Sequence, residues 1–133
     1  MAIKMYLMGF DYGSKRIGVA IGQTITATAS PLAIISVKNN QIDWSNISAL
    51  MQEWQPKELI VGLPKHDDGS DNVMTVAVQR FCRKLYGHYH LPVHTIDERL
   101  SSIAAAERVS GKFLDAVAAQ IILETWFSEL NNS

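Results

Sequence analysis

The sequence contains little cysteine and proline, and it has no long hydrophobic run. One of its 133 residues is cysteine and 4 are proline. The single cysteine, Cys82, excludes an internal disulfide and a zinc site built from several cysteines, and its place in a helical pattern favours a buried filler. No apolar run is long enough to span a bilayer, and residues 1–6 lack the apolar core of a signal peptide. We therefore expect a cytoplasmic protein with no membrane partner.

The chain is also nearly balanced in charge, with 12 Lys and Arg, 13 Asp and Glu, and a formal net charge of −1 at pH 7. This balance argues against a protein that coats nucleic acid indiscriminately, although it allows a local basic patch. No internal repeat, low-complexity segment or flexible linker interrupts the sequence, and its length suits one domain with its own core. We predict a single α/β domain over residues 1–133.

The stretch over residues 7–22, LMGFDYGSKRIGVAIG, organises the rest of the chain. Its apolar residues predict a strand, a tight turn and a second strand, with Asp11 at the end of the first. A carboxylate in a buried strand is costly unless a positive or hydrogen-bonding group meets it, so we expect a site at Asp11. Gly13 and Gly18 remove side chains beside the turn, which lets a ligand or another backbone approach closely. The alternative is that Asp11 only caps the turn at Ser14.

Downstream, apolar runs and helical patterns follow one another. Apolar runs bounded by Gly, Pro or charged residues predict strands over residues 28–37, 58–64 and 91–96. Helical spacing predicts helices over residues 42–54, 72–86 and 114–130, with Asp71 or Asn72 capping the second. A further short helix is predicted to begin at Ser101 or Ser102 and to be interrupted by Gly111. These elements predict the following core residues: Leu7, Ile17, Val19, Ile60, Val61, Val93, Ile96, Val117 and Ile121.

Three acidic residues stand where an apolar element meets a loop: Asp11, Glu98 and Asp115. Carboxylates that converge on one point repel one another unless a cation lies between them. Oxygen ligands of this kind suit Mg²⁺ or Mn²⁺, and the chemistry they indicate is phosphodiester hydrolysis. Two of these residues have plainer interpretations. Asp115 could simply be an acidic residue that the helix dipole favours in a first turn, and Glu98 could pair with Arg99 or Arg16.

Four ordered motifs carry a family resemblance: FDYGSKRIGVAIG, IVGLPKHDDGS, DERLSS and DAVAAQIIL. Over nearly the whole chain they resemble the YqgF family, also called RuvX, whose members are described as Holliday-junction resolvases or pre-16S rRNA nucleases. The resemblance implies a ribonuclease H-like fold, a five-stranded mixed sheet of order 3-2-1-4-5 with helices on both faces. It also implies that Asp11, Glu98 and Asp115 are catalytic metal ligands. Asp97 matches the other acid of DERL, and because side chains alternate along a strand only one of the two is expected to face the metal.

The sequence departs from the family in one place, because members carry a longer, basic stretch between DERL and the final aspartate. Here only residues 101–114 intervene, so either the loop is shortened or a mobile segment is missing from the sequence. Candidate nucleic-acid contacts elsewhere are Lys15, Arg16, Lys65 and Arg99, which stand in loops near the acidic residues and could hold phosphates. The alternatives are solvated loop charges or, for Arg99, a residue that orients Glu98.

Together these observations predict a divalent-metal-dependent nuclease using Mg²⁺ or Mn²⁺. The resemblance favours structured RNA, in particular the 5′ end of pre-16S rRNA, and binding to ribosomal precursor particles. The alternatives are a resolvase of four-way DNA junctions or a nucleic-acid-binding domain of the same fold that does not cleave. An ATPase related to actin and sugar kinases would need a second lobe, which this length does not supply. The sequence leaves open a monomer or a homodimer.

Overall fold

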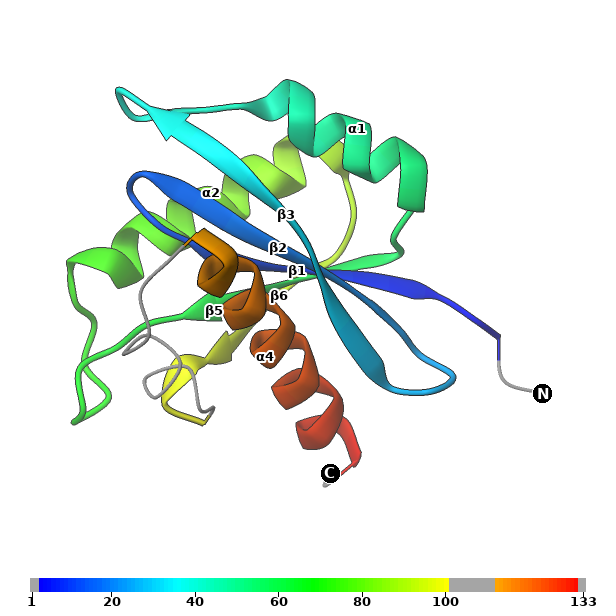
Figure 1. Cartoon of the computed structure of the whole chain (residues 1–133). Coiled ribbons are helices and arrows are strands. Elements are labelled where there is room, and N and C mark those ends of the chain that lie inside the picture. The colour runs from blue at the N-terminus through cyan, green and yellow to red at the C-terminus, as the bar shows by residue number, and fades with distance from the viewer. Residues whose placement is uncertain (1–2, 101–111, 132–133) are drawn as a thin grey trace.

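The computed structural model describes residues 3–100 and 112–131, which form a twisted mixed sheet with helices on both faces (Figure 1). The strands are β1 Tyr6–Tyr12, β2 Arg16–Gln23, β3 Thr28–Lys38, β4 Gln41–Ile42, β5 Glu58–Leu63 and β6 Val93–Asp97. The helices are α1 Trp44–Trp54, α2 Val73–Tyr89 and α4 Lys112–Asn131, with a 3-10 turn, η1, at Glu98–Leu100. The short helix predicted near Ser101 lies outside the described residues.

The strands lie in the order β4-β3-β2-β1-β5-β6. β1, β2 and β3 form an antiparallel meander, whereas β5 and β6 run parallel to β1. Without β4 this is the predicted order 3-2-1-4-5, so the predicted ribonuclease H-like topology is confirmed. The central position of β1 makes the end of this strand, where Asp11 lies, the junction of the antiparallel and parallel halves.

The strand count differs from the prediction because β3 folds back on itself to form β4. Asn39 and Asn40 have φ of 53° and 63°, which suits the two-residue turn that closes a tight hairpin. Ile42 therefore belongs to a strand and not to the first turn of a helix as predicted. α1 begins after Asp43, whose side chain accepts a hydrogen bond from the backbone N–H of Asn46.

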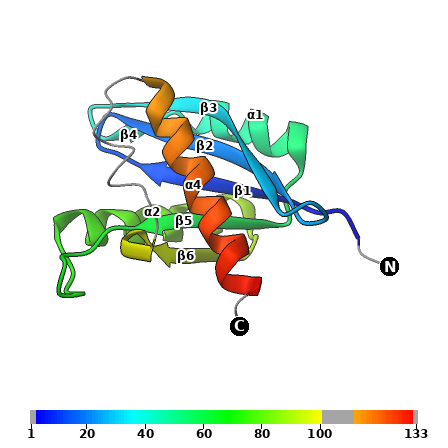
Figure 2. The same ribbon diagram turned by 60° about the horizontal axis from the view of Figure 1, so that its bottom comes forward.

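The two faces of the sheet carry separate cores. α1 and α2 lie behind the sheet in Figure 2, and α4 crosses its front face. Behind the sheet, buried residues such as Met8 and Phe10 of β1 pack with Phe81 of α2. In front of it, Leu7 and other small or aliphatic residues of the sheet pack with residues such as Ile122 of α4.

Six of the nine predicted core residues are buried, and three are not. The confirmed residues are Leu7, Ile17, Val19, Ile60, Val61 and Ile96. Val93, Val117 and Ile121 are only half-buried, so their prediction as core was wrong. α4 is apolar on nearly all faces, and its sequence therefore does not determine which face meets the sheet. Val93 lies at the start of edge strand β6 and covers the core from its rim.

α2 is capped at both ends. Asn72 and Thr75 form a reciprocal capping box, in which each side chain accepts a hydrogen bond from the other residue's backbone N–H. The helix continues past the predicted residue 86 to Tyr89 and ends at His90 in the left-handed conformation. Among residues 3–100 and 112–131, no helix has the length and hydropathy needed to cross a membrane.

Candidate active site

Asp11 lies in the middle of a lateral row of three positions on neighbouring strands. Its cross-strand partner on β2 is Gly18, and the pairing of Phe10 with Val61 places Gly62 of β5 beside it on the other side. Alternation along β1 turns Asp11 toward the same face as Leu7, which packs in the α4 core. Two strand spacings of about 4.8 Å make the row roughly 10 Å wide.

Asp115 approaches this row through the backbone of α4. A Cβ built on Gly18 would lie 1.8 Å from the carbonyl oxygen of Asp115, so this position accepts only glycine while α4 stays in place. The prediction that Gly18 lets another backbone approach closely is therefore confirmed. The Asp115 carboxylate accepts a hydrogen bond and ion pair from Nε of Arg16, which alternation places on the same face as Gly18.

Glu98 belongs to η1, and its side chain reaches the other end of the row, at Gly62. Its Oε1 lies 2.8 Å from the point where a Cβ of Gly62 would stand, and Ile122 of α4 lies against the same point. The Glu98 carboxylate thus covers β5 on the face that Asp11 shares. Asp97 precedes it in β6 opposite Leu63, and alternation turns its side chain to the other face, away from Ile96.

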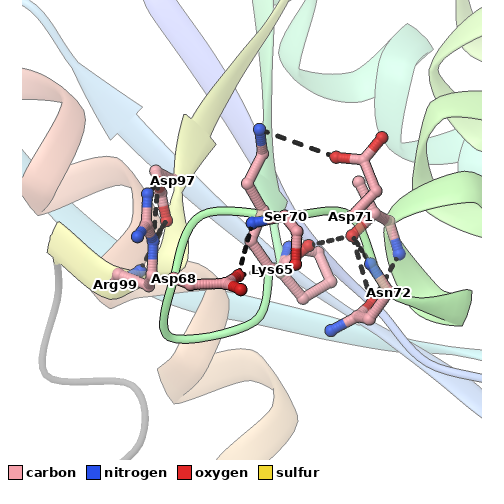
Figure 3. A network of polar contacts seen from close by, with 9 residues as sticks. Lys65, Asp68, Ser70, Asp71, Asn72, Asp97 and Arg99 are labelled. Carbon is pink, nitrogen blue, oxygen red and sulfur yellow. Dashed lines mark hydrogen bonds and ion pairs between the residues drawn. The ribbon is translucent and has the colours of Figure 1, made fainter.

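Asp97 instead belongs to a polar network that braces the loop after β5 (Figure 3). Nε of Arg99 donates to both Asp97 oxygens at 3.1 and 3.0 Å, and its Nη2 donates at 2.6 Å. Nη1 of Arg99 donates to the carbonyl of Asp67 at 3.2 Å, beside Gly69, whose φ is 89°. Hydrogen bonding from Arg99 lowers the pKa of Asp97, and the same contact raises the pKa of Arg99.

Within the same loop, Lys65 forms an ion pair of 3.7 Å with Asp71 (Figure 3). Asp68 accepts hydrogen bonds from the backbone and hydroxyl of Ser70, and the hydroxyl bond is the main cause of its lowered pKa. Of the four basic residues predicted to contact nucleic acid, three therefore have acidic partners in this structure. Lys15 is exposed in the β1–β2 turn and forms no ion pair with a described residue.

The row presents oxygen donors of the kind that Mg²⁺ and Mn²⁺ bind. Gly18 and Gly62 flank Asp11, and a Cβ at either would fill the space that Asp115 or Glu98 takes. The chemistry of these carboxylate donors fits a divalent cation. In the part of the chain that the structure describes, however, no group of three or more His, Cys, Asp or Glu is already arranged to hold one. In this structure the Asp115 carboxylate is paired with Arg16.

Nothing in the sequence alone marks Gly62 as part of the site. Its only signal in the sequence is a glycine near the end of an apolar strand, which is equally typical of a bulge or a strand end. The sequence also left Asp97 and Glu98 undistinguished, because the exact end of β6 decides which of the two faces α4. The structure separates them, and it assigns Asp97 to the loop and Glu98 to the row with Asp11.

Comparison with known proteins defines first the class and then the family. The structure of Thermus thermophilus RuvC in complex with a Holliday junction substrate superposes with a TM-score of 0.64, covers 96% of both chains and shares 14% sequence identity. At this identity the likeness establishes the fold alone, which is ribonuclease H-like. The sequence profile described as "RuvX: Holliday junction resolvase" matches residues 5–129. The chain belongs to the RuvX family, and its predicted class, a nuclease, is confirmed.

Two relatives show how completely the family pattern extends along the chain. The chain is 47% identical over 130 residues to "Putative pre-16S rRNA nuclease" of Hydrogenovibrio crunogenus, covering 96% of this chain and 97% of that protein. The protein of the same description from Pseudomonas paraeruginosa is 42% identical over 135 residues, covering 95% and 94%. The first alignment spans almost all of both chains, so the short connection between DERL and Asp115 is not a long deletion relative to that protein.

Proposed function

We propose that this chain is a divalent-metal-dependent nuclease that cleaves structured RNA, with the 5′ end of pre-16S rRNA as its substrate. The observation that carries the proposal is the row on the α4 face, where Asp11 stands between Asp115 over Gly18 and Glu98 over Gly62. The description of the relatives supports the choice of RNA. A substrate in ribosomal precursor particles also places the enzyme in the cytoplasm.

Asp11, Glu98 and Asp115 would hold Mg²⁺ or Mn²⁺ in this row. When bound, the cation stabilises the charge that develops on the phosphate oxygens during hydrolysis. Arg16 keeps the Asp115 carboxylate beside β2, so it acts as a positioning residue for this ligand. The backbone of α4 has no room to shift toward the sheet at Gly18, which fixes the start of the helix against the row.

The basic residues divide into two groups under this proposal. Lys15 is exposed on the β1–β2 turn, close in sequence to Asp11, and contacts substrate phosphates. Lys65 and Arg99 hold the loop after β5 through Asp71 and Asp97, so their effect on substrate is indirect.

The decisive experiment compares Asp11→Asn with Asp97→Asn. Both substitutions remove one negative charge and nearly preserve shape, but the two side chains lie on opposite faces of the sheet. We expect Asp11→Asn to lose roughly a hundredfold or more in cleavage of a ribosomal precursor RNA with Mn²⁺ or Mg²⁺, because the lost ligand misplaces the reacting groups. Asp97→Asn should retain cleavage. Thermal unfolding without metal should show that Asp11→Asn still folds cooperatively, so that its loss of cleavage reflects a lost ligand and not a lost fold.

Four-way DNA junctions are the second candidate substrate, because the matching family is described by that activity. The same assay with a four-way junction in parallel decides between them. Faster cleavage of the junction than of the precursor would transfer the proposal to DNA. Binding of both without metal-dependent cleavage by the wild type would instead identify a non-cleaving domain, and retained cleavage by pure Asp11→Asn protein would refute the role of the row.

A further inference from the structure

A concave site lies on the face of the sheet opposite the row of Gly18, Asp11 and Gly62, at the same end of β1. It is a pocket of about 320 Å³ between the β1–β2 turn, the β3–β4 hairpin and α2. Its polar wall comes from Ser14, Asn40, Arg80 and Lys84. Tyr12 and Phe81 also line it, with their ring centroids 5.0 Å apart. We call this site the α2 pocket.

Among the described residues that line it, the α2 pocket has two basic side chains and no acidic one. Arg80 and Lys84 are one helical turn apart, so they lie on the same face of α2. Like charges at this spacing destabilise a helix, and an anion between them would relieve the repulsion. The sequence of α2 from Val73 to Tyr89 contains no Asp or Glu. Neither Arg80 nor Lys84 forms an ion pair with any residue that the structure describes.

The position of the α2 pocket relates it directly to the carboxylate row. Asp11 and Tyr12 are consecutive in β1, so one side chain faces α4 and the other faces α2. The row and the pocket therefore flank the same strand end and are separated by the β1–β2 turn, on which Lys15 is exposed. A polyanion that crosses this turn meets the carboxylates on one side and Arg80 with Lys84 on the other.

We propose that the α2 pocket binds a backbone phosphate of the nucleic-acid substrate, several nucleotides away from the bond that is cleaved. The inference rests on the proposed function for the identity of the ligand and adds a contact that fixes the substrate's register. Arg80 and Lys84 supply the charge, and the hydroxyl of Ser14 and the amide of Asn40 supply neutral donors. Phosphate contacts of this kind position a strand without reading its bases.

The test measures binding without cleavage. A fluorescein-labelled RNA hairpin is titrated with protein in EDTA at several salt concentrations, and the slope of log K against log salt is compared between two double variants. Arg80→Gln with Lys84→Gln should weaken binding roughly tenfold or more and reduce the magnitude of the slope by about 1 for each phosphate that is no longer neutralised. The matched control, Lys57→Gln with Arg83→Gln, removes the same charge from exposed positions that do not line the pocket. It should change the slope much less.

Equal losses of affinity in both double variants would overturn the proposal, because the effect would then come from net charge alone.

Adenosine 5′-monophosphate distinguishes a strand from a free nucleotide. If this nucleotide binds the wild type in a way that depends on Arg80 and Lys84 while the hairpin slope stays unchanged, the pocket is not a substrate site. Because EDTA removes the cation, failure of cleavage in the active-site experiment leaves this result interpretable, and an unchanged slope refutes the pocket contact even if cleavage is confirmed.

Discussion

Helix α4 packs on glycines, whereas α1 and α2 pack on large side chains. Four glycines of the sheet, Gly9, Gly18, Gly22 and Gly62, would each place a Cβ within 3.1 Å of an α4 atom. On the other face the strands present residues such as Met8 and Phe10, which keep the helices at the distance of a full side-chain layer. The face that α4 covers, which we call the close face, therefore brings Asp115 and Glu98 directly against the strands. The face that α1 and α2 cover, which we call the cushioned face, provides most of the bulky core. Stability and catalysis should accordingly respond to substitutions on different faces.

The largest loss of stability is expected from the cushioned face. Leu85 of α2 is fully buried and does not line the α2 pocket. Leu85→Ala should lower the free energy of unfolding by about 2–5 kcal/mol, because it removes apolar packing and leaves a cavity. Urea unfolding measures the loss, and cleavage assayed well below the melting temperature should be nearly unchanged per folded molecule. A loss of cleavage larger than tenfold in folded protein would show that the two faces are not independent.

The close face should show the reverse pattern in Gly18→Ala. The added Cβ meets the backbone carbonyl of Asp115, and backbone cannot move aside as a flexible side chain can. We expect overpacking to cost about 1–3 kcal/mol in unfolding free energy. Displacement of the first turn of α4 by even about 1 Å should reduce cleavage roughly a hundredfold. Activity that falls only in proportion to the unfolded fraction would contradict the role assigned to this contact.

A smaller, pH-dependent effect is expected from Asp97→Asn, which acts on the side away from α4. Hydrogen bonding from Arg99 lowers the pKa of Asp97 in the folded protein. The stabilisation is therefore fully present above the ordinary aspartate pKa of about 3.9 and is lost as the pH falls through the lower folded value. At pH 6 the melting temperature of Asp97→Asn should lie below that of the wild type. This decrease should be smaller than the decreases in Leu85→Ala and Gly18→Ala. This gap should close in melts recorded below pH 4, and a gap that stays constant down to the acid transition would show that the contact is not electrostatic.

The smallest effect is expected from Gly87→Ala, which is a gain. Gly87 lies inside α2, and a Cβ there would have no neighbour within 4 Å. Alanine should raise the unfolding free energy by up to about 1 kcal/mol through helix propensity alone. Chemical unfolding measures this gain, and the variant also serves as the matched control for Gly18→Ala. A loss of stability here would mean that glycine substitutions in this chain cannot be interpreted from local space.

The sequence predicted most of the fold because each strand carries a strong apolar run with clear boundaries. It predicted the wrong face of α4 because this helix is apolar on nearly all faces, so its own sequence does not distinguish Val117 and Ile121 from the buried Ala118 and Ile122. The strand β4 was missed because its two residues follow a turn made by Asn39 and Asn40 and carry no periodic signal of their own. In the sequence Arg80 and Lys84 resemble a solvated helix face, since nothing local distinguishes a pocket wall from a surface.

The single cysteine packs at the rim of the core between the sheet and α2. Cys82 lies in α2 and is partly buried, and desolvation raises its pKa to about 11. Only the thiolate reacts readily, so Cys82 is a protonated and unreactive thiol at neutral pH. A partly buried, protonated side chain agrees with the interpretation of Cys82 as packing filler.

The hairpin that forms β4 leaves most of the outer rim of β3 uncovered. β4 pairs only with Val37 and Lys38, so residues 28–36 have no outer neighbour among the described strands. An exposed rim of this length is a template on which another chain could add a strand and begin aggregation. Pro31 lies in the middle of this rim, and the register shifts beside it between Val19 and Ala20 of β2. Proline and the bulge interrupt the regular ladder that an added strand would need, which protects the sheet from edge-to-edge growth.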